Sequence, residues 1–432
     1  MQFKANDAPV EICDNYTYLG LVFKPSGSTI QPQKELFSKA SKAWFSISSI
    51  IYQNKKMPIK QSLQLLDSIC MPVGLYSANF LTPLSLPKAA LQCKHSILKA
   101  WENYPLEKIN QRACRTILSL SKKATRLAVL SELGRYPVFL NALIASISYE
   151  WHLRHRAPTD SLARLALSEM ESWADPGHDS WLARVKSICK LLDIKELHAQ
   201  LSPDTVRGKL KKVLRSKFEI FWKDELNDPK LGADNISHNK LRFYSQFKSC
   251  FKTENYVETV KNRNQRCWLS RLRVSAHHLA VEKLRYSRPP IPPELRFCEY
   301  CGGGSQNLPK SQDSEIHFLM ECNNFEHKRA CFLKRLECHV PNIMSLSKEN
   351  KVKTMLCPTS PQAAKLVNKF IGIMFNARES IDKGENILSY PTWDPNLPNP
   401  FLNHPIDDAN DSDLFSDLSF VSTSSMSGDC SN

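Results

Sequence analysis

Four residues in the last third of the chain have the spacing of a metal-ligand set. Cys298 and Cys301 are separated by two residues, and His317 and Cys322 by four, in the pattern Cys-x2-Cys-x15-His-x4-Cys. Three thiolates and one imidazole are a tetrahedral set that Zn²⁺ prefers, and four protein ligands leave no open position for chemistry. The spacing therefore predicts a closed, structural zinc site that holds a small, loop-rich unit together.

The sequence around the four residues favours this interpretation. Residues 297–304 (FCEYCGGG) are typical of a hairpin turn at paired cysteines, because glycine tolerates positive φ. Residues 315–322 (EIHFLMEC) predict a short helix that presents His317 inward and ends near Cys322.

Two alternatives to this ligand set remain open. Three further side chains of the same types follow on a predicted helix: His327, Cys331 and Cys338. One of them could take the place of His317 in the site. Otherwise the cysteines and the histidine are unrelated core or surface residues.

The chain is strongly basic. Its 432 residues include 58 Lys and Arg against 43 Asp and Glu, which gives a net charge of +15. Residues 385–432 contain eight acids and no Lys or Arg, so residues 1–384 carry +23, eight more than the whole chain. A folded body of this charge attracts polyanions by counterion release, and nucleic acid is the expected partner. The alternative is a solvated basic surface with a ribosome-like or anionic-membrane partner.

Cysteine usage and hydropathy predict the compartment. Fourteen cysteines are scattered between Cys13 and Cys430, and the first residues form no apolar leader. This pattern indicates a reduced, intracellular protein of the nucleus and cytoplasm. No run of 18 apolar residues occurs, since polar residues and a proline interrupt even residues 63–81, so we expect no membrane partner.

Hydrophobic periodicity predicts a mainly α-helical fold with a short N-terminal β hairpin. Residues 16–23, rich in β-branched and aromatic side chains, predict the hairpin. Apolar residues at spacings of three and four predict helices at about 32–52, 58–72, 87–101, 106–120, 124–132, 137–156, 160–174, 178–192, 203–226, 323–337, 348–356 and 360–381. Between two of these helices, Gly134 is expected to form a left-handed cap and Pro137 to start the next helix.

Changes in composition divide the chain into segments. The expected segments are a β segment (1–30), a helical domain (31–227), a linker (228–240), a basic helical segment (240–288), the zinc site with C-terminal helices (289–382) and an acidic tail (383–432). The tail is rich in Pro, Asn, Ser and Asp and is expected to be disordered.

Two basic stretches are the candidate nucleic-acid contacts. The helix over 203–226 places apolar residues on one face and basic residues on the other: Lys209, Lys211, Lys212 and Arg215. The stretch 261–288 interleaves cations with rings: Arg263, Arg266, Trp268, Arg271, Arg273, His277, His278, Lys283, Arg285 and Tyr286. Arginine beside planar rings suits a single strand, because it combines phosphate hydrogen bonds with base stacking. The alternatives are a solvated helix face and a packing role for Trp268.

The sequence lacks the common catalytic motifs. It contains no Walker-type glycine loop, no Gly-x-Ser-x-Gly and no His-Glu-x-x-His. The adjacent pair Asp407 and Asp408 lies in the acidic tail, without the strands that would hold a two-metal site. We therefore expect no catalytic residues in this chain alone.

Several motifs, in order, resemble a known family. Residues 16–23 (YTYLGLVF), 42–47 (KAWFSI), 66–76 (LDSICMPVGLY) and 132–137 (ELGRYP) resemble the region after the palm in reverse transcriptases of non-LTR (LINE-type) retrotransposons. Residues 272–283 (LRVSAHHLAVEK) and the Cys-Cys-His-Cys set resemble the C-terminal segment of the same proteins. The resemblance covers about residues 10–335, although the gap between Cys301 and His317 is longer than is usual in the family.

The resemblance implies a fragment of an RNA-directed DNA polymerase. It places the end of the palm at residues 10–28, a thumb-like helical bundle after it, and the zinc knuckle in the RNA- or DNA-binding C-terminal part. The aromatic-x-Asp-Asp box and the endonuclease of the family are absent from this chain. The chain is thus expected to grip RNA or an RNA/DNA duplex without catalysis, with target DNA and an intact retroelement polymerase as further partners. The alternative is a zinc-dependent protein-interaction module derived from a retroelement.

Overall fold

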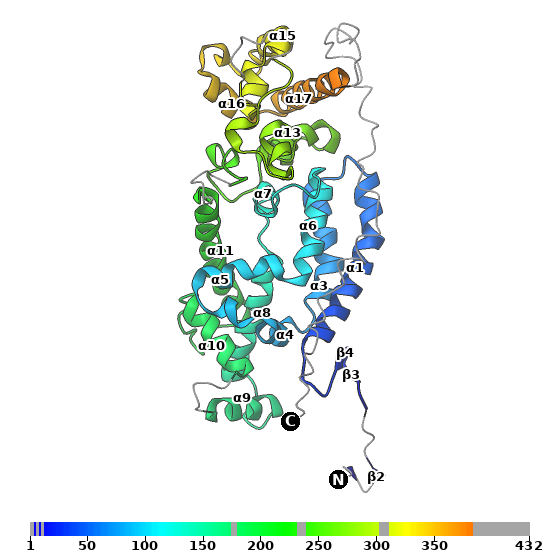
Figure 1. Ribbon diagram of the computed structural model, residues 1–432. Coiled ribbons are helices and arrows are strands. Elements are labelled where there is room, and N and C mark those ends of the chain that lie inside the picture. The colour runs from blue at the N-terminus through cyan, green and yellow to red at the C-terminus, as the bar shows by residue number, and fades with distance from the viewer. Residues whose placement is uncertain are drawn as a thin grey trace, which may run out of the picture. The chain divides into compact units, whose positions relative to one another are not determined.

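The computed structural model describes residues 4–5, 8–9, 13–173, 179–230, 239–301 and 311–382 (Figure 1). These residues are mainly helical, which confirms the predicted fold class. The acidic tail expected over residues 383–432 and most of the linker expected over 228–240 lie outside the described residues. No described helix has the combination of length and apolar composition that crossing a bilayer requires.

Two short antiparallel strand pairs precede the helices. Strand β1 (Lys4–Ala5) pairs with β2 (Ala8–Pro9), and β3 (Tyr16–Tyr18) pairs with β4 (Leu21–Phe23). The turn between β3 and β4 consists of Leu19 and Gly20, both at positive φ, which matches the twist that two-residue hairpins require. The predicted hairpin is therefore confirmed.

The first half of the described chain is a helical array. Helix α1 (Ile30–Gln53) buries one face, because Leu36, Ala40, Trp44 and Ile47 recur at three- and four-residue spacing. It is followed by α2 (Ile59–Leu65), η1 (Leu66–Cys70), α3 (Met71–Gly74), α4 (Ala78–Ser85), η2 (Lys88–Leu91), α5 (Lys94–Lys99), η3 (Ala100–Asn103), α6 (Pro105–Leu118), α7 (Arg126–Glu132), α8 (Val138–His155), α9 (Leu162–Ser172), α10 (Trp181–Leu191) and α11 (Pro203–Asn227). Helix α1 packs against α6, and α8 packs against both α4 and α11.

Most helices of this half agree with the sequence predictions, with two differences. The helix expected over 87–101 is divided into η2, α5 and η3. Helix α4 was not predicted, and Pro83, which lies inside it, has no N–H to donate to the Asn79 carbonyl. The indole Nε1 of Trp181 donates to that carbonyl instead, at 3.0 Å. A contact from a distant helix thus compensates for a residue that reads locally as a helix breaker.

The second half consists of short helices until its C-terminal end. In order they are η4 (Tyr244–Gln246), α12 (Asn255–Thr259), η5 (Arg263–Gln265), α13 (Cys267–Arg273), α14 (Ala280–Lys283), η6 (Leu284–Tyr286), η7 (Pro293–Leu295), η8 (His317–Glu321), η9 (Asn323–Phe325), α15 (Glu326–Leu336), η10 (Ile343–Ser345), α16 (Lys348–Leu356) and α17 (Pro361–Asp382). Helices α15, α16 and α17 confirm the three helices predicted there. The basic helical segment expected over 240–288 is helical only in pieces.

One hydrophobic core joins the two halves. Its buried side chains run from Ala40 to Ala377, and the described residues belong to one compact unit. An isolated bridge pairs Leu133 with Thr253, and helix α13 packs on α17. The boundaries expected near residues 227, 240 and 289 therefore do not separate independent cores.

Candidate metal centre

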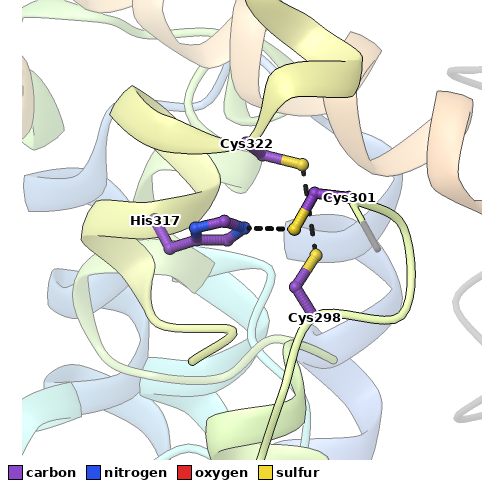
Figure 2. Close-up of side chains that lie close together, drawn as sticks. All are labelled: Cys298, Cys301, His317 and Cys322. Atoms are coloured by element: carbon purple, nitrogen blue, oxygen red, sulfur yellow. Dashed lines mark hydrogen bonds between the residues drawn. The ribbon is translucent and has the colours of Figure 1, made fainter. Parts of the chain in front are cut away.

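The four sequence-predicted ligands lie together in the second half of the fold. Figure 2 shows Cys298, Cys301, His317 and Cys322 with their side chains directed toward one another. One ligand atom from each lies within 4.8 Å of the other three. The two Sγ atoms of Cys298 and Cys322 are 4.0 Å apart, and Sγ of Cys301 lies 3.4 Å from Nε2 of His317. This group could therefore hold a metal ion, as the spacing predicts.

Two local structures place the ligands. Phe297 and Gln312 form an antiparallel bridge, and the Cys298 N–H donates to the Ser311 carbonyl at 2.9 Å, which fixes the first cysteine. His317 begins the π-helical turn η8, and the Cys322 N–H closes it by donating to the His317 carbonyl at 2.9 Å. A π-type bond joins residues five apart, which is the spacing of His317 and Cys322. The His-x4-Cys pattern thus corresponds to one such turn.

The site is buried, and backbone carbonyls beside it accept hydrogen bonds from a buried arginine. Cys298 is 4% exposed, Cys322 is fully buried, and His317 is 3% exposed. Arg329 of α15 donates from Nε to the Leu319 carbonyl at 2.8 Å and from Nη2 to the Cys322 carbonyl at 2.7 Å. Carbonyl groups at the end of a helical turn have no partner within the turn, so a buried arginine is a suitable donor for them.

A second arginine lies against the sulfur atoms. Arg378 of α17 donates to both carboxylate oxygens of Asp313, at 2.8 and 3.0 Å, and its Nη2 lies 3.7 Å from Sγ of Cys298. The rings of Tyr300 and Phe318 lie 4.5 and 4.7 Å from its guanidinium carbon. Burial alone lowers the pKa of Arg378, but Asp313 outweighs burial and raises that pKa above its ordinary value. A permanent positive charge therefore faces the thiolate side of the site.

The side chains of Cys298 and Cys322 interact through their sulfur atoms, which are 4.0 Å apart. A hydrogen bond from the Cys322 thiol lowers the pKa of Cys298 below its ordinary value, and the same bond raises the pKa of Cys322. A metal that binds both sulfur atoms as thiolates must displace the proton of this hydrogen bond.

The histidine presents a defined nitrogen to the sulfur atoms. Nε2 of His317 faces Cys301, whereas Nδ1 is buried without a hydrogen-bond partner in the described residues. The carboxylate of Glu321 lies 3.8 Å from Nδ1. A carboxylate near the outer nitrogen favours the tautomer with a proton on Nδ1 and a free lone pair on Nε2. Nε2 is therefore the nitrogen that this imidazole offers to a metal ion.

The alternative ligands do not join the group. His327 and Cys331 lie on α15, and Cys338 is exposed after its end. In the part of the chain that the structure describes, the clustered ligand atoms come from Cys298, Cys301, His317 and Cys322, and from none of these three.

Four of the predicted nucleic-acid contacts are corrected by the structure, because Arg263, Arg266, Arg273 and His277 are buried. Arg263 donates to the carbonyls of Tyr52 in α1 and Thr116 in α6, at 2.6 and 3.1 Å. Arg266 donates to the Ile117 carbonyl at 3.1 Å. Cations at the C-terminal ends of helices satisfy free carbonyls and oppose the negative end of the helix dipole.

The other two buried residues pair with acids. Arg273 contacts Glu132 at 2.8 Å, and His277 lies 3.2 Å from Glu315. Burial alone would raise the pKa of Glu315, but His277 and Arg242 lower it to about 2. These side chains are therefore buried and paired with acids inside the protein.

Three other residues of the basic stretch also contact protein groups. Trp268 stacks on Phe375 of α17 with 5.4 Å between ring centroids, which agrees with its alternative role in packing. Arg271 lies 4.9 Å from the Trp268 ring and donates to the Ser119 carbonyl at 3.2 Å. Arg285 lies 3.2 Å from Glu282.

Four of the remaining candidates face solvent. Lys209, Lys211, Lys212 and Lys283 are exposed. On α11 the apolar face is buried, including Val206, Leu210 and Leu214, as the pattern predicted. Arg215 is half-buried and lies 4.5 Å from the ring of Tyr136.

Sequence reasoning missed the residues that support the ligands. Arg378 and Asp313 lie 65 positions apart, so no local pattern joins them. The signal that was available is a single arginine within the apolar face of α17, beside the buried Met374 and Ala377.

Comparison with known proteins identifies no relative. No protein-family model matches the chain, and no curated protein or solved structure matches it. The resemblance to LINE-type reverse transcriptases therefore stays an expectation drawn from the sequence.

Proposed function

We propose that this chain is a non-catalytic nucleic-acid-binding module whose C-terminal part is stabilised by zinc. The observation that carries the proposal is the convergence of three buried or half-buried cysteines and one histidine, with ligand atoms within 4.8 Å of one another. A closed set of this kind stabilises a fold and leaves no coordination position for a substrate.

The geometry of the group fits a tetrahedral zinc ion. Zn–S bonds of about 2.3 Å place two sulfur atoms about 3.8 Å apart in a tetrahedron. The Sγ atoms of Cys298 and Cys322 are 4.0 Å apart. Soft thiolates with one imidazole favour zinc over magnesium or calcium, which prefer oxygen ligands. Arg378 would stabilise the negative charge of three thiolates around a divalent ion.

The metal centre is linked to the basic segment before it. Asp313, which follows the bridge beside Cys298, accepts a hydrogen bond from the Ala280 N–H at 2.7 Å. Arg296 donates to the Val281 carbonyl at 2.7 Å. Both bonds hold α14, which carries the exposed Lys283. Bound zinc would thus keep a basic surface in place.

The charge of the chain supports a nucleic-acid ligand. Residues 1–384 carry +23, and lysines on α11 and α14 remain exposed after many arginines have been buried. The resemblance of the ordered motifs to LINE-type reverse transcriptases favours RNA or an RNA/DNA duplex, with target DNA and an intact retroelement polymerase as further partners. In that role the chain grips the strand and another protein supplies the polymerase chemistry.

Salt dependence tests the nucleic-acid assignment. The full chain is titrated with a labelled RNA oligonucleotide at 50 and 200 mM salt, by filter binding. With about four phosphates contacted, a slope of about −0.7 per phosphate predicts a loss of roughly 50-fold in affinity over this range. A slope near zero, or no binding at 50 mM salt, contradicts the proposal and favours a protein-interaction module.

Elemental analysis tests the metal assignment. We expect about one zinc per chain after purification without added metal, in line with one closed four-ligand site. Iron in place of zinc would correct the identity of the ion, because tetrahedral thiolate sites also accept iron. Material that stays metal-free after zinc is added back under reducing conditions would contradict the site.

A further inference from the structure

Three segments that are distant in the sequence meet beside α14. The loop after α6 contributes Lys123, the segment that leads to η4 contributes Lys240, and η6 contributes Tyr286. The amino group of Lys240 donates to the Lys123 carbonyl and lies 3.4 Å from the Tyr286 hydroxyl and 5.7 Å from its ring centroid. Tyr286 is 59% exposed, and Lys123 is exposed too. An exposed aromatic ring therefore lies next to Lys240, whose amino group also contacts the backbone of Lys123.

The acids near this place are already paired with arginines. Glu282 is buried, and its carboxylate lies 2.7 Å from Nη1 of Arg242 and 3.2 Å from Nε of Arg285. Within the described ranges, no carboxylate lies at ion-pair distance from Lys123, Lys240 or Lys283. The three ammonium groups therefore have no anionic partner among these residues.

The cations raise one another's electrostatic energy. Burial lowers the pKa of Lys240, and although Glu282 opposes this, Arg285, Lys123 and Arg242 lower it further. Burial also lowers the pKa of His278, with contributions from Lys123 and Lys283. An anion that lies beside Lys240 and His278 favours their charged forms.

We propose that a single strand of nucleic acid binds across the surface formed by Lys123, Lys240, His278, Lys283 and Tyr286, with phosphates on the lysines and a base stacked on Tyr286. This inference rests on the proposed nucleic-acid function and assigns it a place and a strand type. An exposed ring beside lysine side chains suits an unpaired base, whose face is free to stack. In a duplex the base faces are covered by their neighbours, so the ring would have no partner.

The sequence pattern indicated only some of the residues of this surface. The stretch 261–288 supplies Lys283, His278 and Tyr286, but Lys123 and Lys240 lie outside both basic stretches. The fold brings them together, while it buries arginines of the same stretch such as Arg263 and Arg273.

Charge variants test whether this surface is where the strand binds. The full chain, K123A/K283A and the matched control K56A/K60A, which removes two exposed lysines at the start of α2 and just before it, are titrated with a labelled 12-residue oligo(U) at several salt concentrations. We expect K123A/K283A to bind at least tenfold more weakly, with a salt slope smaller by about 1.4, since each phosphate contact contributes about 0.7. We expect the control to remain within threefold of the parent. Equal binding by K123A/K283A and the parent would overturn the assignment.

Ring variants test the stacking. Tyr286→Ala should weaken oligo(U) binding about tenfold without changing the salt slope. Tyr286→Phe should bind as well as the parent, because stacking needs the ring and not the hydroxyl. A matched duplex should compete at least tenfold less well than oligo(U). Equal competition would overturn the single-strand assignment. Circular dichroism melting of each variant confirms folding.

The outcomes separate the two proposals. If the parent chain binds no oligonucleotide at low salt, the proposed function itself fails. If the parent binds but K123A/K283A and Tyr286→Ala bind equally well, only the assigned surface fails. If K56A/K60A weakens binding as much as K123A/K283A does, the loss reflects total charge and the assigned surface fails.

Discussion

Arg273 and Glu132 form a fully buried ion pair, with 2.8 Å between Nη2 and Oε1, that joins α13 to α7. Glu254 lies 2.9 Å from the same Nη2, and the Tyr244 and Tyr256 hydroxyls donate to Glu132. Burial would raise the pKa of Glu132, but Arg273 lowers it below its ordinary value. Both charges are therefore retained inside the core, each satisfied by several partners.

Replacing Arg273 with Met should destabilise the protein by about 3 to 5 kcal/mol, because Glu132 would remain buried without its cation. Chemical denaturation measures this loss. The control Lys283→Met removes an exposed cation from the same basic stretch and should change the free energy of unfolding by about 0.5 kcal/mol or less. Equal effects of the two changes would show that Arg273 is not an internal structural residue.

Replacing Gly134 with Ala should destabilise the fold by about 1 to 3 kcal/mol, because this glycine has φ of +56°. An added Cβ would also lie 2.5 Å from the Thr253 nitrogen and 2.9 Å from the Lys252 carbonyl carbon, and backbone atoms there cannot move aside. Gly208→Ala on α11 is the matched control, since nothing lies within 4 Å of its added Cβ. That change should stabilise the helix by about 0.5 to 1 kcal/mol. Thermal melting of both variants checks the opposite signs.

The buried Glu107 should make stability depend on pH between about 4.5 and 7. Burial raises the pKa of Glu107 to about 7, although Asn110 and the Phe139 N–H lower it in part. The folded state thus prefers the neutral carboxyl, so this contribution is full below the unfolded pKa of about 4.3 and is lost as pH rises toward 7. The expected loss is about 3 kcal/mol.

Glu107→Gln tests this dependence. The variant carries no ionisable group there, so its free energy of unfolding should fall less between pH 4.5 and 8 than that of the parent. Glu196→Gln, at an exposed position, should keep the parent's pH dependence. A parallel pH profile for Glu107→Gln and the parent would contradict the role of Glu107.

Replacing Cys298 with Ser should release about one zinc per chain and expose residues 296–325 to protease, because a structural site needs all four ligands. Cys338→Ser is the control, since Cys338 is exposed and lies outside the ligand group. Elemental analysis and limited proteolysis read out both changes. Stoichiometric zinc in Cys298→Ser would move the site to other cysteines. A strong chelator should lower the melting temperature of the parent but not that of Cys298→Ser.

The sequence predicted local features well and distant pairings poorly. Helices such as α6 and α17 follow from apolar periodicity, and the four ligands follow from spacing, because both signals lie within short stretches. The basic stretch suggested nucleic-acid contacts for arginines that are buried. The sequence shows that Arg273 is charged, but not that Glu132, 141 positions away, is its partner. Arg263 and Arg266 likewise meet carbonyls at the ends of α1 and α6.

The arginines at the ends of α1 and α6 determine where this gene product can be divided. A truncated chain that starts at residue 240 would retain Arg263 and Arg266 but lose the Tyr52, Thr116 and Ile117 carbonyls that accept from them. It would also lose the buried side chains that the first half contributes to the shared core. Expression of residues 240–432 as a separate recombinant fragment should therefore yield aggregated material, whatever metal is supplied.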